Sequence, residues 1–197
     1  MSKTRVTKPV EERRQEIINT ARLMFTENGF DKTQMADISK KMNVAAGTVY
    51  HYFKSKTDLL YAVIDELTDE NKKKKQRLLN ESEGSALDHL RYILTAFENG
   101  ELHGESNSSF LSDPATIQYY LAKMASSYLP IFSSLIEKGN ADGSWDLEYP
   151  TETAVFILQG MAGVMAKEQE RKDSPQEKSK RIKTYTKFIL RVLCEKK

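Results

Sequence analysis

The sequence predicts an all-α protein, with a small N-terminal domain of three helices followed by a larger helical domain. Apolar residues recur about every 3.6 residues along most of the chain, whereas the alternation typical of strands is rare. Two of the first three helical segments are short and follow each other almost directly, which is typical of a helix-turn-helix. We therefore expect two domains, residues 1–55 and residues 56–197.

The first helix is expected over residues 9–28. Pro9 suits the first turn of a helix, and Asn28 with Gly29 is a typical stop signal. Ile17, Ala21, Met24 and Phe25 share one face at helical spacing.

The two short helices are expected over residues 34–42 and 45–52, with Thr33 as N-cap of the first. Asn43 lies between them, and asparagine tolerates the left-handed backbone conformation that ends a helix. With about three residues between them, the helices cannot run antiparallel for any length. They must form an angled pair.

A fourth helix should begin after Ser55, which Asp58 completes as a capping box. Further helices are expected near residues 85–99, 114–138, 151–171 and 175–195. Ser174 and Pro175 give the last of these a strong start signal.

Charge is distributed unevenly along the chain. The formal net charge is only +2, yet residues 1–56 hold 11 Lys/Arg against 6 Asp/Glu, and the remainder holds 19 against 22. A chain with a basic N-terminal part and an acidic remainder is suited to bind a polyanion through the N-terminal part alone. A single cysteine, Cys194, suits a reducing cytosol, and neither a signal peptide nor an apolar run long enough for a membrane is visible. We expect a cytoplasmic protein without a membrane partner.

The third helix carries the candidate nucleic-acid interface. Val44, Val49 and Phe53 should point inward, which leaves small residues on the outer side, where the backbone can approach base edges in a major groove. These outer residues are Ala45, Ala46, Gly47, Thr48 and His51. Tyr50 and His51 offer polar tips to phosphates, and Lys56 adds charge nearby. The alternative is a small structural bundle with no DNA role.

A long run of residues at fixed spacing carries a family resemblance. It comprises Phe25, Gly29, Phe30, Ile38, the segment 44–56, Leu59 and Leu60. In this run, which covers residues 10–60, the chain resembles the DNA-binding domain of the TetR family of bacterial transcriptional regulators. The resemblance implies a homodimer of two-domain, all-helical subunits, usually a repressor that a small ligand releases from double-stranded DNA.

By this resemblance, nine residues contact DNA: Thr33, Gln34, Ala45, Ala46, Gly47, Thr48, Tyr50, His51 and Lys56. Two positions depart from the family pattern, because many relatives have Ser or Thr in place of Ala45 and a long polar residue in place of Ala46. The sequence specificity must then depend more on Gln34, on Thr48 and on DNA shape.

The larger domain is expected to form the dimer and to bind the ligand. The helix near 151–171 is apolar nearly all round, so one neighbour cannot bury it, and the helix near 175–195 has an apolar stripe. Together they suit an intersubunit four-helix bundle, although both could instead pack within one subunit. A hydrophobic ligand would meet aromatic and methionine side chains, unless these only form the core. The candidates are Tyr92, Phe97, Phe110, Tyr120, Met124 and Tyr128.

No constellation for catalysis is visible. His51, His89 and His103 lie far apart and lack acidic or cysteine partners at metal-ligand spacing. There is no phosphate-binding glycine loop and no nucleophile elbow. We expect no metal, no cofactor and no enzyme. The predicted function is a homodimeric repressor released from a palindromic operator by a small hydrophobic ligand; the alternative is a DNA-binding or partner-recruiting protein without an effector.

Overall fold

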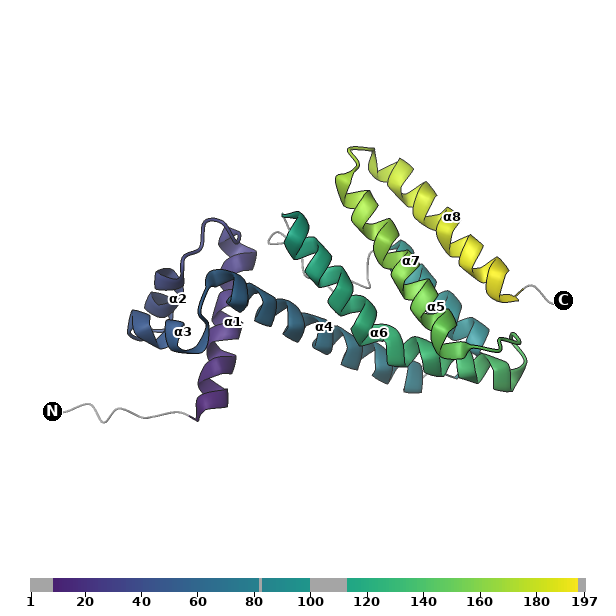
Figure 1. Cartoon of the computed structure of the whole chain (residues 1–197), viewed down its shortest axis with the longest axis horizontal. Coiled ribbons are helices and arrows are strands. Elements are labelled where there is room, and N and C mark those ends of the chain that lie inside the picture. Colours follow the sequence, from purple (N-terminus) through teal and green to yellow (C-terminus); the bar gives the residue numbers. More distant parts are fainter. Residues whose placement is uncertain (1–8, 82, 100–112, 195–197) are drawn as a thin grey trace. The chain divides into compact units, whose positions relative to one another are not determined.

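The computed structural model describes residues 9–81, 83–99 and 113–194 (Figure 1). The described residues form helices joined by turns and loops, with no strand among them, which confirms the predicted all-α class. The helices are α1 (Val10–Asn28), α2 (Met35–Lys41), α3 (Ala46–Tyr52), α4 (Lys56–Glu81), α5 (Ala86–Glu98), α6 (Pro114–Asp142), α7 (Pro150–Glu170) and α8 (Pro175–Cys194).

The chain divides into two compact units. Among the described residues, the first comprises 9–67 and 113–116, and the second comprises the rest. The first unit therefore continues past the predicted division at residue 55 into the first turns of α4, where Leu59, Leu60 and Val63 are fully buried. These turns complete the core of the first unit.

The first unit packs α1 against α2 and α2 against α3. On α1, Ile17, Ala21 and Phe25 are fully buried as predicted, whereas Met24 is half-buried. The helix ends at Gly29, whose φ of 84° is favourable for glycine alone, and the Gly29 N–H donates to the Phe25 carbonyl at 3.0 Å. The predicted stop signal is confirmed.

The turn between α2 and α3 is closed by backbone hydrogen bonds around Asn43. Asn43 has a φ of 53°, as predicted for the left-handed position. Its N–H donates to the Lys40 carbonyl at 3.1 Å, and the Val44 N–H donates to the Ser39 carbonyl at 3.0 Å. These two bonds satisfy the last carbonyls of α2 and fix the direction in which α3 leaves.

The start of α2 differs from the prediction. Gln34, and not Thr33, is the N-cap residue, and its backbone N–H donates to Asp37 Oδ2 at 2.9 Å. Thr33 is 1% exposed, and its hydroxyl donates to the Gly29 carbonyl at 2.9 Å. Thr33 thus joins the end of α1 to the start of α2.

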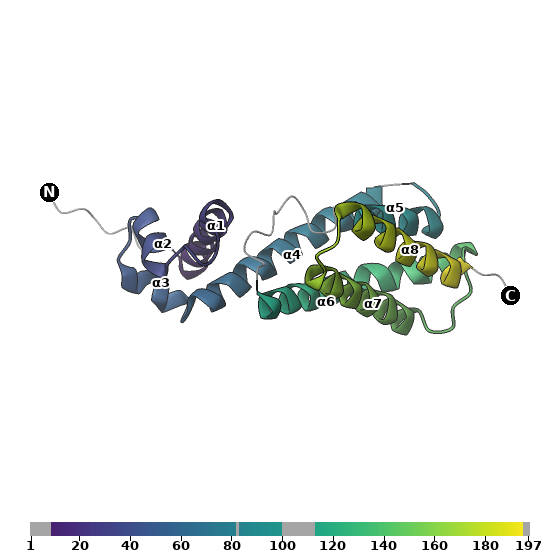
Figure 2. The ribbon, with the colours of Figure 1, turned by 90° about the horizontal axis from the view of Figure 1, so that it is seen from above.

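In the second unit, α6 lies beside α7, and α5 packs against α8 (Figures 1 and 2). Helix α6 changes direction partway along its length (Figure 1), as expected of a helix that carries Pro130 in its interior. The predicted start of α8 is confirmed, because the Glu177 N–H donates to Ser174 Oγ at 3.3 Å.

The C-terminal end of α6 is covered by the indole ring of Trp145. Trp145 is 5% exposed, and its Nε1 donates to the Ile136 carbonyl at 2.8 Å. The ring lies directly on Gly139, where an added Cβ would be 2.0 Å from Trp145 Cε2. Only glycine allows this close approach.

Gly139→Ala is therefore expected to expel the indole ring and to lower the free energy of unfolding by about 1–3 kcal/mol, as overpacking generally does. Gly163→Ala is the matched control, because a Cβ there meets no atom within 4 Å. The control should gain up to about 1 kcal/mol from helix propensity. Urea unfolding followed by circular dichroism measures both changes, and equal stabilities of the two variants would contradict the packing at Gly139.

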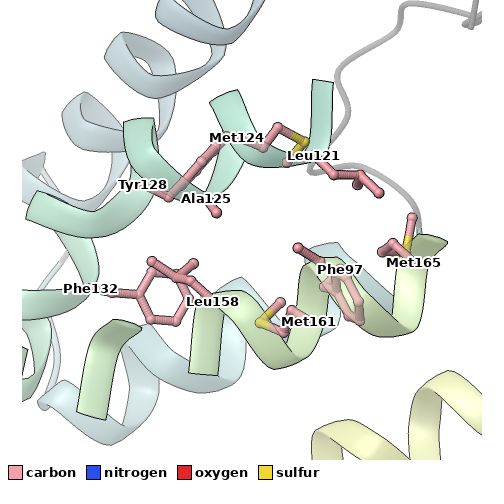
Figure 3. A pocket seen from close by; sticks show the side chains of 10 residues that line it. Phe97, Leu121, Met124, Ala125, Tyr128, Phe132, Leu158, Met161 and Met165 are labelled. Carbon is pink, nitrogen blue, oxygen red and sulfur yellow. The ribbon is translucent and has the colours of Figure 1, made fainter. Parts of the chain in front are cut away.

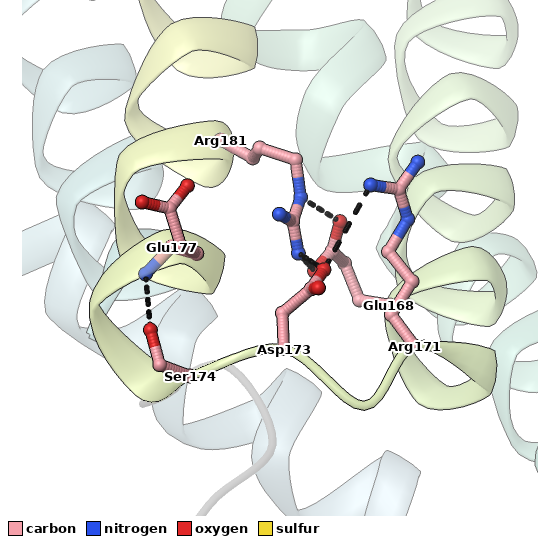
Figure 4. Close-up of polar contacts among 6 residues, drawn as sticks. All are labelled: Glu168, Arg171, Asp173, Ser174, Glu177 and Arg181. Carbon is pink, nitrogen blue, oxygen red and sulfur yellow. Dashed lines mark hydrogen bonds and ion pairs between the residues drawn. The ribbon is translucent and has the colours of Figure 1, made fainter.

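A partly buried ion pair joins α7 to α8 near the connection between them (Figure 4). Glu168 has a side chain that is 2% exposed, and it accepts hydrogen bonds from Arg181 Nε at 2.9 Å and from Nη2 at 2.8 Å. The same Nη2 lies 2.8 Å from Asp173 Oδ2. The hydrogen bonds from Arg181 hold the pKa of the Glu168 carboxyl below its ordinary value.

This lowered pKa predicts an acid-sensitive contribution to stability. It is fully present above about pH 4.3, the ordinary pKa of glutamate, and is lost as the pH falls through the lower folded-state value. Glu168→Gln should lower the Tm at pH 7 and should flatten the decline of Tm between about pH 5 and pH 3. Calorimetry across this range checks the prediction; parallel curves for the variant and the unaltered protein would contradict it.

Candidate DNA-binding surface and interior cavity

Helix α3 presents a smooth outer surface. Ala45, Ala46 and Gly47 are exposed at its start, and nothing lies within 4 Å of a Cβ built on Gly47. Tyr50, 50% exposed, and His51 point outward one turn later, while Thr48 is half-buried. Because the side chains at the start of α3 are small, the backbone of its first turn can come close to base edges in a DNA major groove.

The opposite face of α3 fixes the helix to the unit. Val49 is fully buried and Phe53 is 4% exposed, as predicted, and the Arg14 guanidinium lies 5.2 Å from the centroid of the Phe53 ring. Val44 is half-buried in the turn. Contacts from α1 and α2 therefore hold the exposed surface of α3 in one orientation.

Two of the nine predicted DNA contacts have side chains engaged elsewhere. The Thr33 hydroxyl is buried, as described above. The Lys56 ammonium donates to the Phe30 carbonyl at 2.9 Å and lies 4.2 Å from the centroid of the Phe30 ring. In this structure both residues tie the α1–α2 connection to its surroundings, so their placement favours a positioning role. Gln34 is exposed beside α2.

Three lysine side chains on and before α2 were not singled out by the sequence reasoning. Lys32, Lys40 and Lys41 line an open hollow that also includes Asp37. Lys40 and Lys41 follow Asp37 by three and four residues on the seven-residue α2, so the three side chains are neighbours on the helix surface. This spacing is visible in the sequence and could have identified the cluster.

The second unit contains an apolar cavity of about 40 Å³ between α5, α6 and α7 (Figure 3). Helix α6 supplies a stripe at helical spacing, and α7 supplies a second stripe that faces it. The lining residues are Phe97, Leu121, Met124, Ala125, Tyr128, Phe132, Leu158, Met161, Ala162 and Met165. None of them carries a charge.

Three of the six predicted ligand residues line this cavity: Phe97, Met124 and Tyr128. Tyr120 is buried but does not line it, because Leu121, one position further round α6, shares the face of Met124 and Tyr128. Tyr92 is 45% exposed, with the Lys75 ammonium 5.6 Å from its ring centroid, and is not part of the lining. Phe110 lies outside the described residues.

The contribution of α7 to the cavity was missed. Leu158, Met161 and Met165 share one face at helical spacing, and this face points to α6. The sequence reasoning assigned the whole helix to a dimer interface. Its apolar surface on nearly all sides was the signal that it has two neighbours rather than one.

The other apolar face of α7 forms an open groove with α8. Phe156 is 75% exposed, and Phe188 and Val192 on α8 are 62% and 54% exposed. The groove has a volume of about 270 Å³, and Phe97 and Met161 border both it and the cavity. Large apolar side chains this exposed mark an interaction surface.

The described parts of the chain contain no group of three or more His, Cys, Asp or Glu side chains placed to hold a metal ion. Among the helices of those same parts, none combines the length and the apolar character that crossing a bilayer requires.

Comparison with known proteins places the first unit in a known family. Residues 17–63 match the family model described as bacterial regulatory proteins, tetR family. YfiR of Bacillus subtilis (strain 168), an uncharacterised HTH-type transcriptional regulator, is 27% identical over 184 residues, which cover 82% of each chain. HbdR of Aromatoleum sp. (strain CIB), also an HTH-type transcriptional regulator, is 38% identical over 69 residues, and the matching part covers 34% of this chain and only 30% of HbdR.

Solved structures share the fold along nearly the whole chain. A TetR-family transcriptional regulator from Pectobacterium atrosepticum is 22% identical, with a TM-score of 0.73 and coverage of 98% of this chain and 99% of that one. RolR, crystallised in complex with resorcinol, is 16% identical, with a TM-score of 0.70 and coverage of 93% and 88%.

An all-α chain with this N-terminal unit is a transcriptional regulator that binds DNA through a helix-turn-helix. The match over residues 17–63 identifies the first unit as a DNA-binding domain of the TetR family of bacterial regulatory proteins, and the whole chain shares the fold of a solved TetR-family regulator.

Proposed function

We propose that the protein is a homodimeric repressor that binds a palindromic operator and leaves it when a small hydrophobic ligand occupies the cavity of the second unit. The observation that carries the DNA-binding part is the exposed face of α3, held by the buried Val49 and Phe53. The proposed contacts are Gln34, Ala45, Ala46, Gly47, Thr48, Tyr50 and His51, with Thr33 and Lys56 as positioning residues.

In this proposal α3 lies in the major groove. Ala45 and Ala46 contact thymine methyl groups, and Thr48 contacts a base edge. Tyr50 and His51 bind phosphates, which fixes the register but carries no sequence information. Because long base-reading side chains are absent from the first turn of α3, part of the specificity must come from the shape of the operator.

The proposed occupant of the α7–α8 groove is a second copy of the chain. Two copies of these helices related by a two-fold axis form a four-helix bundle that covers Phe156 and Phe188. A two-fold axis is also what a pair of recognition helices needs to contact the two half-sites of a palindrome. A two-fold dimer formed through this surface would therefore cover the exposed apolar side chains and would also match the symmetry of a palindromic operator.

The proposed effector site is the cavity between α5, α6 and α7. Its uncharged lining of aromatic, aliphatic and methionine side chains suits a hydrophobic or aromatic compound. RolR, which has the same fold, binds the aromatic compound resorcinol. To release DNA, the ligand must bind more tightly to the conformation that does not fit the operator.

Footprinting on DNA upstream of the protein's own gene, repeated with a panel of hydrophobic compounds, tests the proposal. The expected result is a symmetric protected region that disappears when an effective compound is added. Tight binding of a compound to the second unit without any change in operator affinity would contradict the release mechanism.

A second function is a regulator without an effector, which acts in the cytoplasm as an architectural or partner-recruiting protein. The cavity volume of about 40 Å³ favours it, because known ligand pockets are commonly about 300–1,000 Å³. This function predicts sequence-tolerant binding with a steep dependence on salt, and no response to any compound in the panel.

A further inference from the structure

A buried hydroxyl group in the cavity lining lacks a hydrogen-bond partner. Tyr128 is 4% exposed and lines the cavity, and its Oη makes no hydrogen bond to any of the described residues. An unsatisfied buried polar group destabilises the fold, so such groups are rare in folded proteins and call for an explanation.

Burial raises the pKa of Tyr128 to about 12. The hydroxyl therefore keeps its proton at neutral pH and can both donate and accept a hydrogen bond. Every other lining side chain is aliphatic, aromatic or a thioether. Tyr128 thus carries the one strong polar group among the lining side chains, and none of them carries a charge that could neutralise a charged ligand.

We propose that the effector is an uncharged, mainly apolar compound with one hydrogen-bonding group that pairs with the Tyr128 hydroxyl. The inference rests on the proposed function, in that it takes the cavity as the effector site. Burial of an unpaired ionised group against this lining would be strongly unfavourable, which excludes carboxylates and amines in their charged forms. The single polar group gives orientation, and the apolar lining gives affinity.

The cavity must enlarge to admit such a compound, because about 40 Å³ does not hold an aromatic ring. Met124, Met161 and Met165 are the lining side chains best able to yield, because methionine is unbranched and adopts many rotamers. Met161 also borders the α7–α8 groove, so this enlargement reaches the surface proposed for the second copy.

Three one-ring probes of similar size test the inference on the full chain: phenol, toluene and benzoate. They differ in whether the ring carries a hydroxyl, a methyl or a charged group. Labelled methionine methyl groups report binding by NMR, since three of the seven methionines line the cavity. We expect phenol and toluene to shift the signals of Met124, Met161 and Met165, and benzoate to leave them unchanged.

Tyr128→Phe should weaken phenol binding about tenfold, the equivalent of one lost hydrogen bond, and should change toluene binding less than about twofold. Tyr120→Phe is the matched control, because Tyr120 is buried on the same helix but does not line the cavity. It should leave the affinity for both probes unchanged. The Tm of Tyr128→Phe should be unchanged or higher, because the variant removes a buried hydroxyl that has no protein partner.

The outcomes separate this inference from the proposed function. Equal loss or no loss of phenol affinity in the two tyrosine variants would overturn the role of Tyr128 while leaving the cavity as a ligand site. Binding of benzoate as tight as that of phenol would overturn the uncharged class. If no probe shifts the three methionine signals, this inference is wrong. The release of the operator by a ligand is tested separately, by the footprinting experiment.

Discussion

Ala46→Glu is expected to weaken operator binding by at least about 100-fold, or about 3 kcal/mol, without unfolding the protein. Ala46 is the first residue of α3 and is exposed on the proposed DNA-contacting surface. A glutamate there fills the space that the backbone needs to approach base edges, and it repels the phosphates. The fold should tolerate it, because an acidic residue in the first turn is favourable with respect to the helix dipole.

Thr26→Glu is the matched control for this charge. Thr26 is exposed near the C-terminal end of α1, outside the proposed contacts, so the variant changes the net charge equally. Electrophoretic mobility shift with the footprinted operator measures affinity, and circular dichroism monitors folding. If both variants bind the operator equally well, α3 is not the helix that contacts DNA.

The sequence was sufficient for the first unit because its signals are local. The stop at Gly29, the left-handed Asn43 and the cap at Ser55, whose Oγ accepts from the Asp58 N–H at 3.0 Å, each depend on a few adjacent residues. Thr33 was misassigned as an N-cap because threonine suits that position in isolation. Its actual partner, the Gly29 carbonyl, lies across a loop that residue preferences do not describe.

For the second unit, the sequence predicts where the helices lie along the chain, but not which of their faces pack against each other. Periodicity shows that α7 is apolar on nearly all sides, yet it cannot show that Leu158 and Met161 face α6 while Phe156 remains exposed. The same limit applies to the aromatic residues. Tyr92, Tyr120 and Tyr128 look alike in the sequence, and only the packing of three helices separates an exposed ring from a core ring and a cavity ring.

Phe156→Asp is expected to convert the proposed dimer into a folded monomer and to lower operator affinity by about 10²–10⁴-fold. The side chain is 75% exposed on the isolated subunit, so the aspartate stays solvated there and costs little. In the proposed dimer the same carboxylate would be buried unpaired against Phe188 and Val192, which is strongly unfavourable. A monomer has one recognition helix and loses the effective concentration that links two half-sites.

Val155→Asp is the control for this substitution. Val155 is the adjacent residue on α7, about 100° round the helix, and it does not line the groove. Sedimentation velocity gives the oligomeric state, and titration with whole and half operators separates loss of dimerisation from loss of DNA contact. Phe156 lies in the second unit, outside the proposed DNA contacts. A Phe156→Asp monomer should therefore bind a half-site with the same affinity as one subunit of the unaltered protein. If the variant stays dimeric, the α7–α8 groove has another occupant, and the symmetry of the operator must arise from a different surface.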